Sequence, residues 1–102
     1  MTILEATVDE GKESLLQGAF ENAGAGAIPP GLVRSELLQD PRDKKVWRIQ
    51  TLWASYEALQ KLRSSGETPA GILMFREAGA EPAFSVFNVV DVIQSNTTSH
   101  RA

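Results

Sequence analysis

The spacing of apolar and polar positions changes in a regular order along the chain. Residues 2–8 alternate and carry β-branched side chains, which predicts a first strand. Apolar residues then recur at helical spacing, and they predict a helix over about residues 10–22 with Asp9 as its N-cap. The glycine-rich stretch 23–31, AGAGAIPPG, ends this helix and forms a loop.

Two strand-like stretches follow, over residues 32–38 and about 45–52. The charged stretch between them begins with Asp40-Pro41, a typical turn start, and we expect a hairpin with a loop of about six residues.

A helix is expected over residues 53–62, with Ser55 or a neighbour as its cap. RSSGETPA interrupts the helical pattern, and Thr68-Pro69 is typical of a new helix start, with Thr68 as the N-cap. The second helical piece should therefore cover about residues 69–78. A final strand is expected over about residues 83–93.

The predicted order is β-α-β-β-α-β, with the second helical segment broken in two. This order is typical of the ferredoxin-like arrangement, an α+β fold. We expect a single domain over residues 1–94, followed by a disordered tail over 95–102.

Both faces of the predicted sheet carry apolar side chains. In the third strand Trp47, Ile49 and Thr51 share one face, and the last strand is apolar on both of its faces. Helices of this fold cover one face alone, so the second face needs another cover. A second copy is the simplest cover, and we expect a homodimer packed sheet to sheet.

Composition excludes several classes of function. The chain has no Cys, one His and a net charge of −3, and its ten Lys and Arg are scattered. These features argue against disulfides, thiolate or histidine metal sites, and binding to nucleic acid. The N-terminus lacks the apolar core of a signal peptide, and no apolar stretch approaches the ~20 residues of a membrane span. We therefore expect a cytoplasmic protein without a membrane partner.

The segment from Pro30 to Leu59, PGLVRSELLQDPRDKKVWRIQTLWASYEAL, resembles the antibiotic biosynthesis monooxygenase domain of the dimeric α+β barrel superfamily. The matching features are a Pro-Gly before the second strand, a D-P-x-D turn, and the pattern W-x-S-x-E-A-L from Trp53. The resemblance implies a dimer whose antiparallel sheets form a barrel, with a ligand cavity in each subunit. It also implies, from some members, oxidation of aromatic polyketides or quinols by O2 without a cofactor.

Related members degrade haem and need an axial His shortly after the E-A-L segment. Residues 60–63 are Gln, Lys, Leu and Arg here, and His100 cannot be aligned to that position. The resemblance therefore does not extend to haem degradation, and we expect no cofactor.

Five residues are candidates for binding the substrate. Trp47, Trp53 and Tyr56 could stack on a flat aromatic ligand, or they could instead anchor the core. Arg48 could hold an anionic oxygen, or it could form a surface or interface ion pair. Asn88 interrupts an apolar strand face, so its amide needs either a ligand or a backbone partner.

No catalytic base stands out, and the catalytic residue stays unknown. The acidic or phenolic candidates are Glu36, Glu57, Asp91 and Tyr56. The leading hypothesis is a cofactor-independent monooxygenase acting on a small aromatic or quinol-like substrate. The alternative is a non-catalytic dimeric barrel that binds a small hydrophobic metabolite. In either case, the cavity is expected between the aromatic-bearing strands and the broken helix 53–78.

Overall fold

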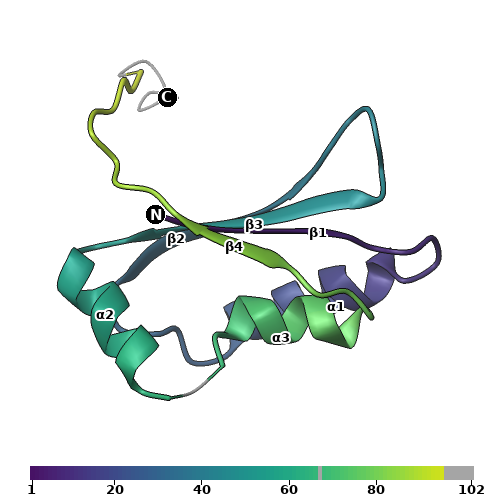
Figure 1. Ribbon diagram of the computed structural model, residues 1–102, viewed down its shortest axis with the longest axis horizontal. Helices are drawn as coiled ribbons and strands as arrows, with labels where there is room; N and C mark the ends of the chain where they lie inside the picture. Colours follow the sequence, from purple (N-terminus) through teal and green to yellow (C-terminus); the bar gives the residue numbers. More distant parts are fainter. Residues whose placement is uncertain (67, 96–102) are drawn as a thin grey trace.

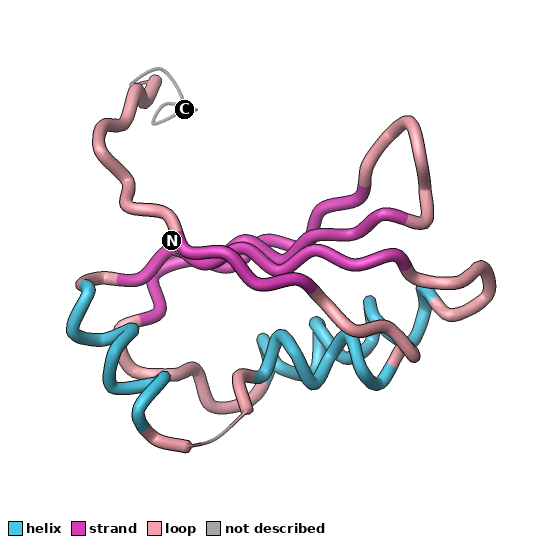
Figure 2. The backbone as a smooth tube through the Cα atoms, in the orientation of Figure 1, coloured by secondary structure: helices cyan, strands magenta, loops and turns pink. Residues whose placement is uncertain are grey.

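The computed structural model describes residues 1–66 and 68–95. It has seven elements in the predicted order, with the second helix divided: β1 (Thr2–Thr7), α1 (Glu13–Ala25), β2 (Leu32–Gln39), β3 (Val46–Trp53), α2 (Tyr56–Ser64), α3 (Ala70–Glu77) and β4 (Ala83–Val86). The strands form one antiparallel sheet in the order β2-β3-β1-β4. All three helices lie on one side of it (Figures 1 and 2). The predicted ferredoxin-like α+β fold is confirmed.

The pairing of β1 with β3 decides which side chains face the helices. Leu4 lies opposite Ile49 and Ala6 lies opposite Trp47, and all four side chains are buried. Because side chains alternate along a strand, the residues between them face the open side of the sheet.

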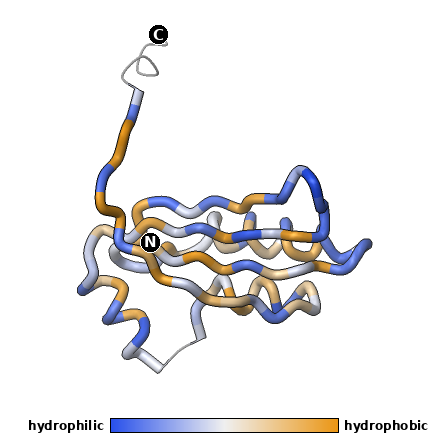
Figure 3. The backbone as a smooth tube through the Cα atoms, turned by 45° about the horizontal axis from the view of Figure 1, so that its top comes forward, coloured by the Kyte–Doolittle hydropathy of each residue, from blue (hydrophilic) through white to orange (hydrophobic). Residues whose placement is uncertain are grey.

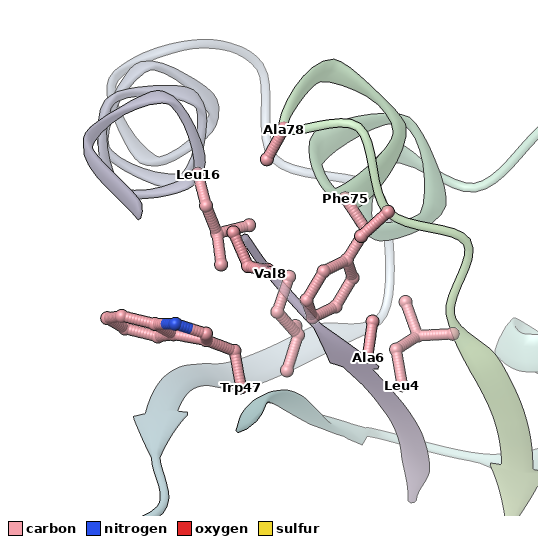
Figure 4. Close-up of a cluster of buried hydrophobic side chains, with 9 residues drawn as sticks. Leu4, Ala6, Val8, Leu16, Trp47, Phe75 and Ala78 are labelled. Carbon is pink, nitrogen blue, oxygen red and sulfur yellow. The ribbon is translucent and has the colours of Figure 1, made fainter. Parts of the chain in front are cut away.

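The core lies where α1 and α3 pack on the sheet. Figure 4 shows Leu16 of α1 and Phe75 of α3 pointing toward the sheet, close to Val8 and Trp47. Leu16 and Phe75 are fully buried, and Trp47 is 5% exposed. The Nε1 atom of Trp47 is buried without a hydrogen-bond partner in the described part of the chain. Leaving a buried donor unpaired costs about 1–3 kcal/mol, so the indole is held there by its apolar packing.

The start of the first helix differs from the prediction. The helix begins at Glu13, and its N-cap position is taken by Lys12, whose side chain makes no capping bond. Asp9 instead closes a turn through its backbone, because its carbonyl oxygen accepts from the Lys12 N–H at 3.0 Å. The Glu13 carboxylate accepts from the Gly11 N–H at 3.0 Å. The predicted Asp9 cap is therefore wrong.

The two later helix starts have different outcomes. Ser55, one of the residues expected to cap this helix, is the N-cap of α2, which begins at Tyr56 and not at residue 53; its Oγ accepts from the Ala58 N–H at 3.1 Å. At α3 the predicted Thr68 cap is wrong, because Pro69 occupies the N-cap position without a side-chain bond.

The last strand is shorter than predicted. β4 ends at Val86, and the pairing continues for one more residue through two bonds between Met1 and Phe87, of 2.7 and 2.8 Å. No other strand of the described chain lies beside residues 88–94, so the strand pairing ends there. It leaves the domain on the side of the sheet opposite the helices (Figure 1). We call residues 87–95 the arm; the rest of the predicted tail, with His100, lies outside the described residues.

Gly31 fixes the position of α2 over the sheet. Its φ is +86°, and a Cβ added there would lie 2.4 Å from the Cβ of Ala58 in α2. Its carbonyl oxygen also accepts from the Ala54 N–H at 2.7 Å, just before α2 begins. A side chain at residue 31 would therefore push α2 away from the start of β2.

We predict that Gly31→Ala destabilises the protein more than Gly11→Ala. Gly11 has a similar φ of +92° but has nothing within 4 Å of an added Cβ, so it controls for backbone strain. The extra loss should be at least about 1 kcal/mol, the usual cost of overpacking. Thermal and urea unfolding measure it. Equal losses, or no recovery when Ala58→Gly is added to Gly31→Ala, would contradict this account of the close contact.

Candidate functional site

A cavity of about 680 Å³ lies between the helix-facing side of the sheet and the three helices. Such a volume is typical of small-molecule sites. Leu4, Ile49 and Phe84 line it from the sheet, Leu59 and Leu62 from α2, and further apolar residues come from α3 and from the end of α1 and the loop after it: Phe20, Ala23, Ala27, Ile28, Pro29, Ala70 and Met74. This is the place that the sequence predicted, between the aromatic-bearing strands and the divided helix.

Small residues keep this end of the molecule unfilled. The run 23–27 is AGAGA, and it contributes several lining positions that have at most a methyl group. On α3, Gly71 lies so close to the sheet that an added Cβ would be 2.6 Å from Cδ1 of Leu4. The helices therefore approach the strands closely at the rim without filling the space between them.

The floor of the cavity is polar along one line across the sheet. Ser35 of β2 lies opposite Thr51 of β3, and Thr51 lies opposite Thr2 of β1. The hydroxyl oxygens of Ser35 and Thr51 are 2.9 Å apart, and the Trp53 indole N–H donates to the Thr2 hydroxyl oxygen at 3.1 Å. All four residues line the cavity.

Two arginines supply the charge at the cavity. Arg34 is engaged by Glu36 at 2.6 Å on an exposed part of β2. Arg63 of α2 lies over the Phe84 ring, with its guanidinium carbon 5.8 Å from the ring centroid. Within residues 1–66 and 68–95, the lining contains no carboxylate, imidazole or phenol.

A smaller pocket of about 210 Å³ lies at the end of the sheet where the arm begins. Tyr56, Asn88 and Val89 line it, and it shares Trp53 and Leu59 with the main cavity. These two shared side chains therefore form the wall between the two spaces.

The structure places the five predicted binding residues in three different surroundings. Trp53 lines both cavities, whereas Tyr56 and Asn88 line the smaller one. Trp47 lies in the core, and Arg48 lies on the open face of the sheet, where its NH2 group is 2.6 Å from the Glu5 carboxylate. The fold thus brings Trp53, Tyr56 and Asn88 together at the smaller pocket. Trp47 packs in the core and Arg48 forms an ion pair, which were the structural alternatives considered for them.

None of the candidate bases lines the main cavity. Glu36 is paired with Arg34, and Asp91 lies on the arm, where it accepts from the Val92 N–H at 2.8 Å. Glu57 is exposed in the first turn of α2, and Tyr56 belongs to the smaller pocket.

The sequence analysis did not identify Arg63 or the row of hydroxyl groups of Ser35, Thr51 and Thr2, which we call the hydroxyl line. A signal for the hydroxyls was present, because Ser35, Thr51 and Thr2 each occupy positions that share a face with core residues. Only the register between strands aligns them, and no local pattern gives that register.

The described residues contain no group of three or more metal-binding side chains. Nor does any described helix combine the length and apolar character that crossing a membrane requires. Away from the cavity, the hydrogen bond between Arg76 and Glu81 lowers the pKa of the Glu81 carboxyl and raises that of Arg76.

An antiparallel four-stranded sheet, covered on one face by helices that border an apolar cavity, defines a ferredoxin-like α+β domain. Residues 1–72 match the antibiotic biosynthesis monooxygenase family, and the chain belongs to that family. No curated protein matches the sequence.

Solved structures with this fold resemble most of the chain. SnoaB, a cofactor-independent oxygenase from Streptomyces nogalater, is 16% identical, with a TM-score of 0.65 over 92% of this chain and 96% of its own. Two further structures carry the name of the family. The protein from Deinococcus radiodurans is 12% identical, with a TM-score of 0.66 over 93% of this chain and 98% of its own. The protein from Caulobacter crescentus is 20% identical, with a TM-score of 0.64 over 88% and 89%. At these identities the likeness establishes the fold.

Proposed function

We propose that the protein is a cofactor-independent monooxygenase that oxidises a small aromatic or quinol-like substrate with O2 in the main cavity. The observation that carries the proposal is the cavity itself: an apolar space of about 680 Å³ with an indole in its wall and a guanidinium in its lining. Membership of the monooxygenase family supports the same reaction type.

Such a reaction needs an electron-rich anion of the substrate. In a substrate with a CH2 group between aromatic rings, this group loses a proton, and the resulting anion transfers one electron to O2. The two radicals combine to a peroxide, whose O–O bond then breaks. One oxygen atom stays as a carbonyl and the other leaves as water, so that CH2 and O2 give C=O and H2O.

The role of the protein in this scheme is to favour the anion. Arg63 lines the cavity and supplies a positive charge, which lowers the pKa of an acidic group on a bound substrate. Because no described side chain in the lining can take up the proton, the proton passes to solvent. Trp53 offers an aromatic face from the cavity wall. Tyr56 and Asn88 would contact a substrate that extends into the smaller pocket.

The same lack of a base in the described lining favours a second candidate function, a non-catalytic protein that binds a small hydrophobic metabolite. An apolar cavity with a few polar contacts is sufficient for binding.

We also propose that two copies pack sheet to sheet. The arm exposes large apolar side chains, with Val90 93% and Ile93 102% exposed, and Figure 3 shows this hydrophobic stretch projecting from the domain. The open sheet face carries the ion pair between Arg48 and Glu5. In a two-fold symmetric dimer the same surface of each copy forms the interface, so each copy would cover the exposed apolar arm of the other.

The oxygenase proposal predicts O2 uptake with a panel of hydroquinones and anthrones, above that of a buffer blank. Arg63→Gln should reduce kcat/KM about tenfold and shift the acidic limb of the pH profile upward by about one unit, because the nearby cation no longer stabilises the anion. Arg42→Gln removes the same charge from the exposed β2–β3 turn and should have no effect.

Uptake equal to the blank with every compound of the panel would favour the binding protein. Equal loss in Arg63→Gln and Arg42→Gln would contradict the role given to Arg63.

The assembly proposal predicts a dimer of about twice 11.1 kDa by light scattering. Val90→Asp should raise the dimer dissociation constant about a hundredfold, because an unpaired buried charge costs about 3 kcal/mol or more. The subunit should keep its melting behaviour, since Val90 is exposed within it. Gln94→Asp is the matched control on the same arm. A parent protein that stays monomeric at all concentrations would refute the dimer.

A further inference from the structure

The hydroxyl line on the cavity floor has spare hydrogen-bonding capacity. Each hydroxyl has one hydrogen to donate and lone pairs to accept with. Ser35 and Thr51 share one bond, which uses one of their two hydrogens. Thr2 accepts from the Trp53 N–H, and its own hydrogen has no acceptor in the described part of the chain. Two hydroxyl hydrogens therefore have no partner within the described protein.

The apolar surroundings of these donors favour a ligand with an acceptor oxygen over a purely apolar ligand. Thr2 and Thr51 are each 7% exposed, and the lining around them is mainly apolar. A buried polar group that makes no hydrogen bond costs free energy. An apolar ligand that covered the floor would remove water from both donors and give them no acceptor in its place. A ligand oxygen placed over the floor would replace that hydration.

The geometry suits a single acceptor atom. When Ser35 donates to Thr51, the two free hydrogens belong to Thr51 and Thr2, which are directly opposite on neighbouring strands, where Cβ atoms are about 4.5–5.5 Å apart. A carbonyl or phenolate oxygen has lone pairs enough to accept from both sides.

We propose that Ser35, Thr51 and Thr2 recognise an oxygen substituent, a carbonyl or a deprotonated hydroxyl, on an otherwise apolar and flat ligand. The inference rests on the proposed function in one respect, that the main cavity is the ligand site. It does not require that the bound ligand is oxidised.

The test uses two rigid tricycles of nearly the same shape, 9-fluorenone and fluorene, which differ in a carbonyl against a CH2 group. Equilibrium dialysis should show that the parent protein binds fluorenone about tenfold more tightly than fluorene, since two hydrogen bonds are at stake. In the double variant Ser35→Ala with Thr51→Val, the preference should fall to about threefold. Removing both partners of one hydrogen bond leaves no orphaned group, so this variant should fold.

Thr7→Val is the matched control, because it removes a hydroxyl from β1 at a position that lines neither cavity. It should keep the tenfold preference. Circular dichroism and melting curves check the fold of each variant.

A second measurement needs no variant. The infrared carbonyl stretch of fluorenone bound to the parent should lie near its frequency in an alcohol. A stretch at the frequency in a hydrocarbon solvent would overturn the proposal, as would equal binding of the two tricycles, binding of neither, or equal effects of the double variant on both. If the preference holds while O2 uptake is absent, the hydroxyl line stands and the oxygenase proposal fails. If uptake is present without the preference, the reverse is true.

Discussion

The antiparallel register between β1 and β3 is the constraint on which the rest of the structure depends. It sets Thr2 against Thr51 and Ala6 against Trp47, and so gives the helix-facing side of the sheet an apolar end and a hydroxyl-bearing end. A shift of β1 by one residue against β3 would turn the side chains of Thr2 and Ala6 to the open face. The core and the cavity floor would be lost together.

The helices divide that face along the strand direction. At one end α1 and α3 press Leu16 and Phe75 onto the sheet, and the packing there is complete. At the other end the roof consists of α2, the first part of α3 and the small residues of the run 23–27, which leave space above the floor. Gly31 holds α2 against the start of β2, so the cavity depends on a close backbone contact rather than on large side chains.

The order of the elements could be predicted because each depends on local spacing, and the Ser55 cap on local chemistry. The end of the last strand could not, since alternation over residues 83–93 does not reveal whether a neighbouring strand is present. The site residues could be predicted only in part, because they too depend on which elements lie beside each strand. Trp47 and Trp53 share a strand face six residues apart, roughly 20 Å along the strand. Sequence gives no means of telling which indole α1 buries and which one the cavity receives.

The central claim is that ligands bind over the hydroxyl floor beside Trp53, not at the core indole of Trp47. The chain has two Trp, so a proton–nitrogen correlation spectrum contains two indole N–H signals, which Trp47→Phe assigns. On titration with 9-fluorenone, the Trp53 signal should move, because its N–H donates to Thr2 on that floor, and the Trp47 signal should stay in place. A shift of the Trp47 signal alone, or of neither at saturation, would contradict the account.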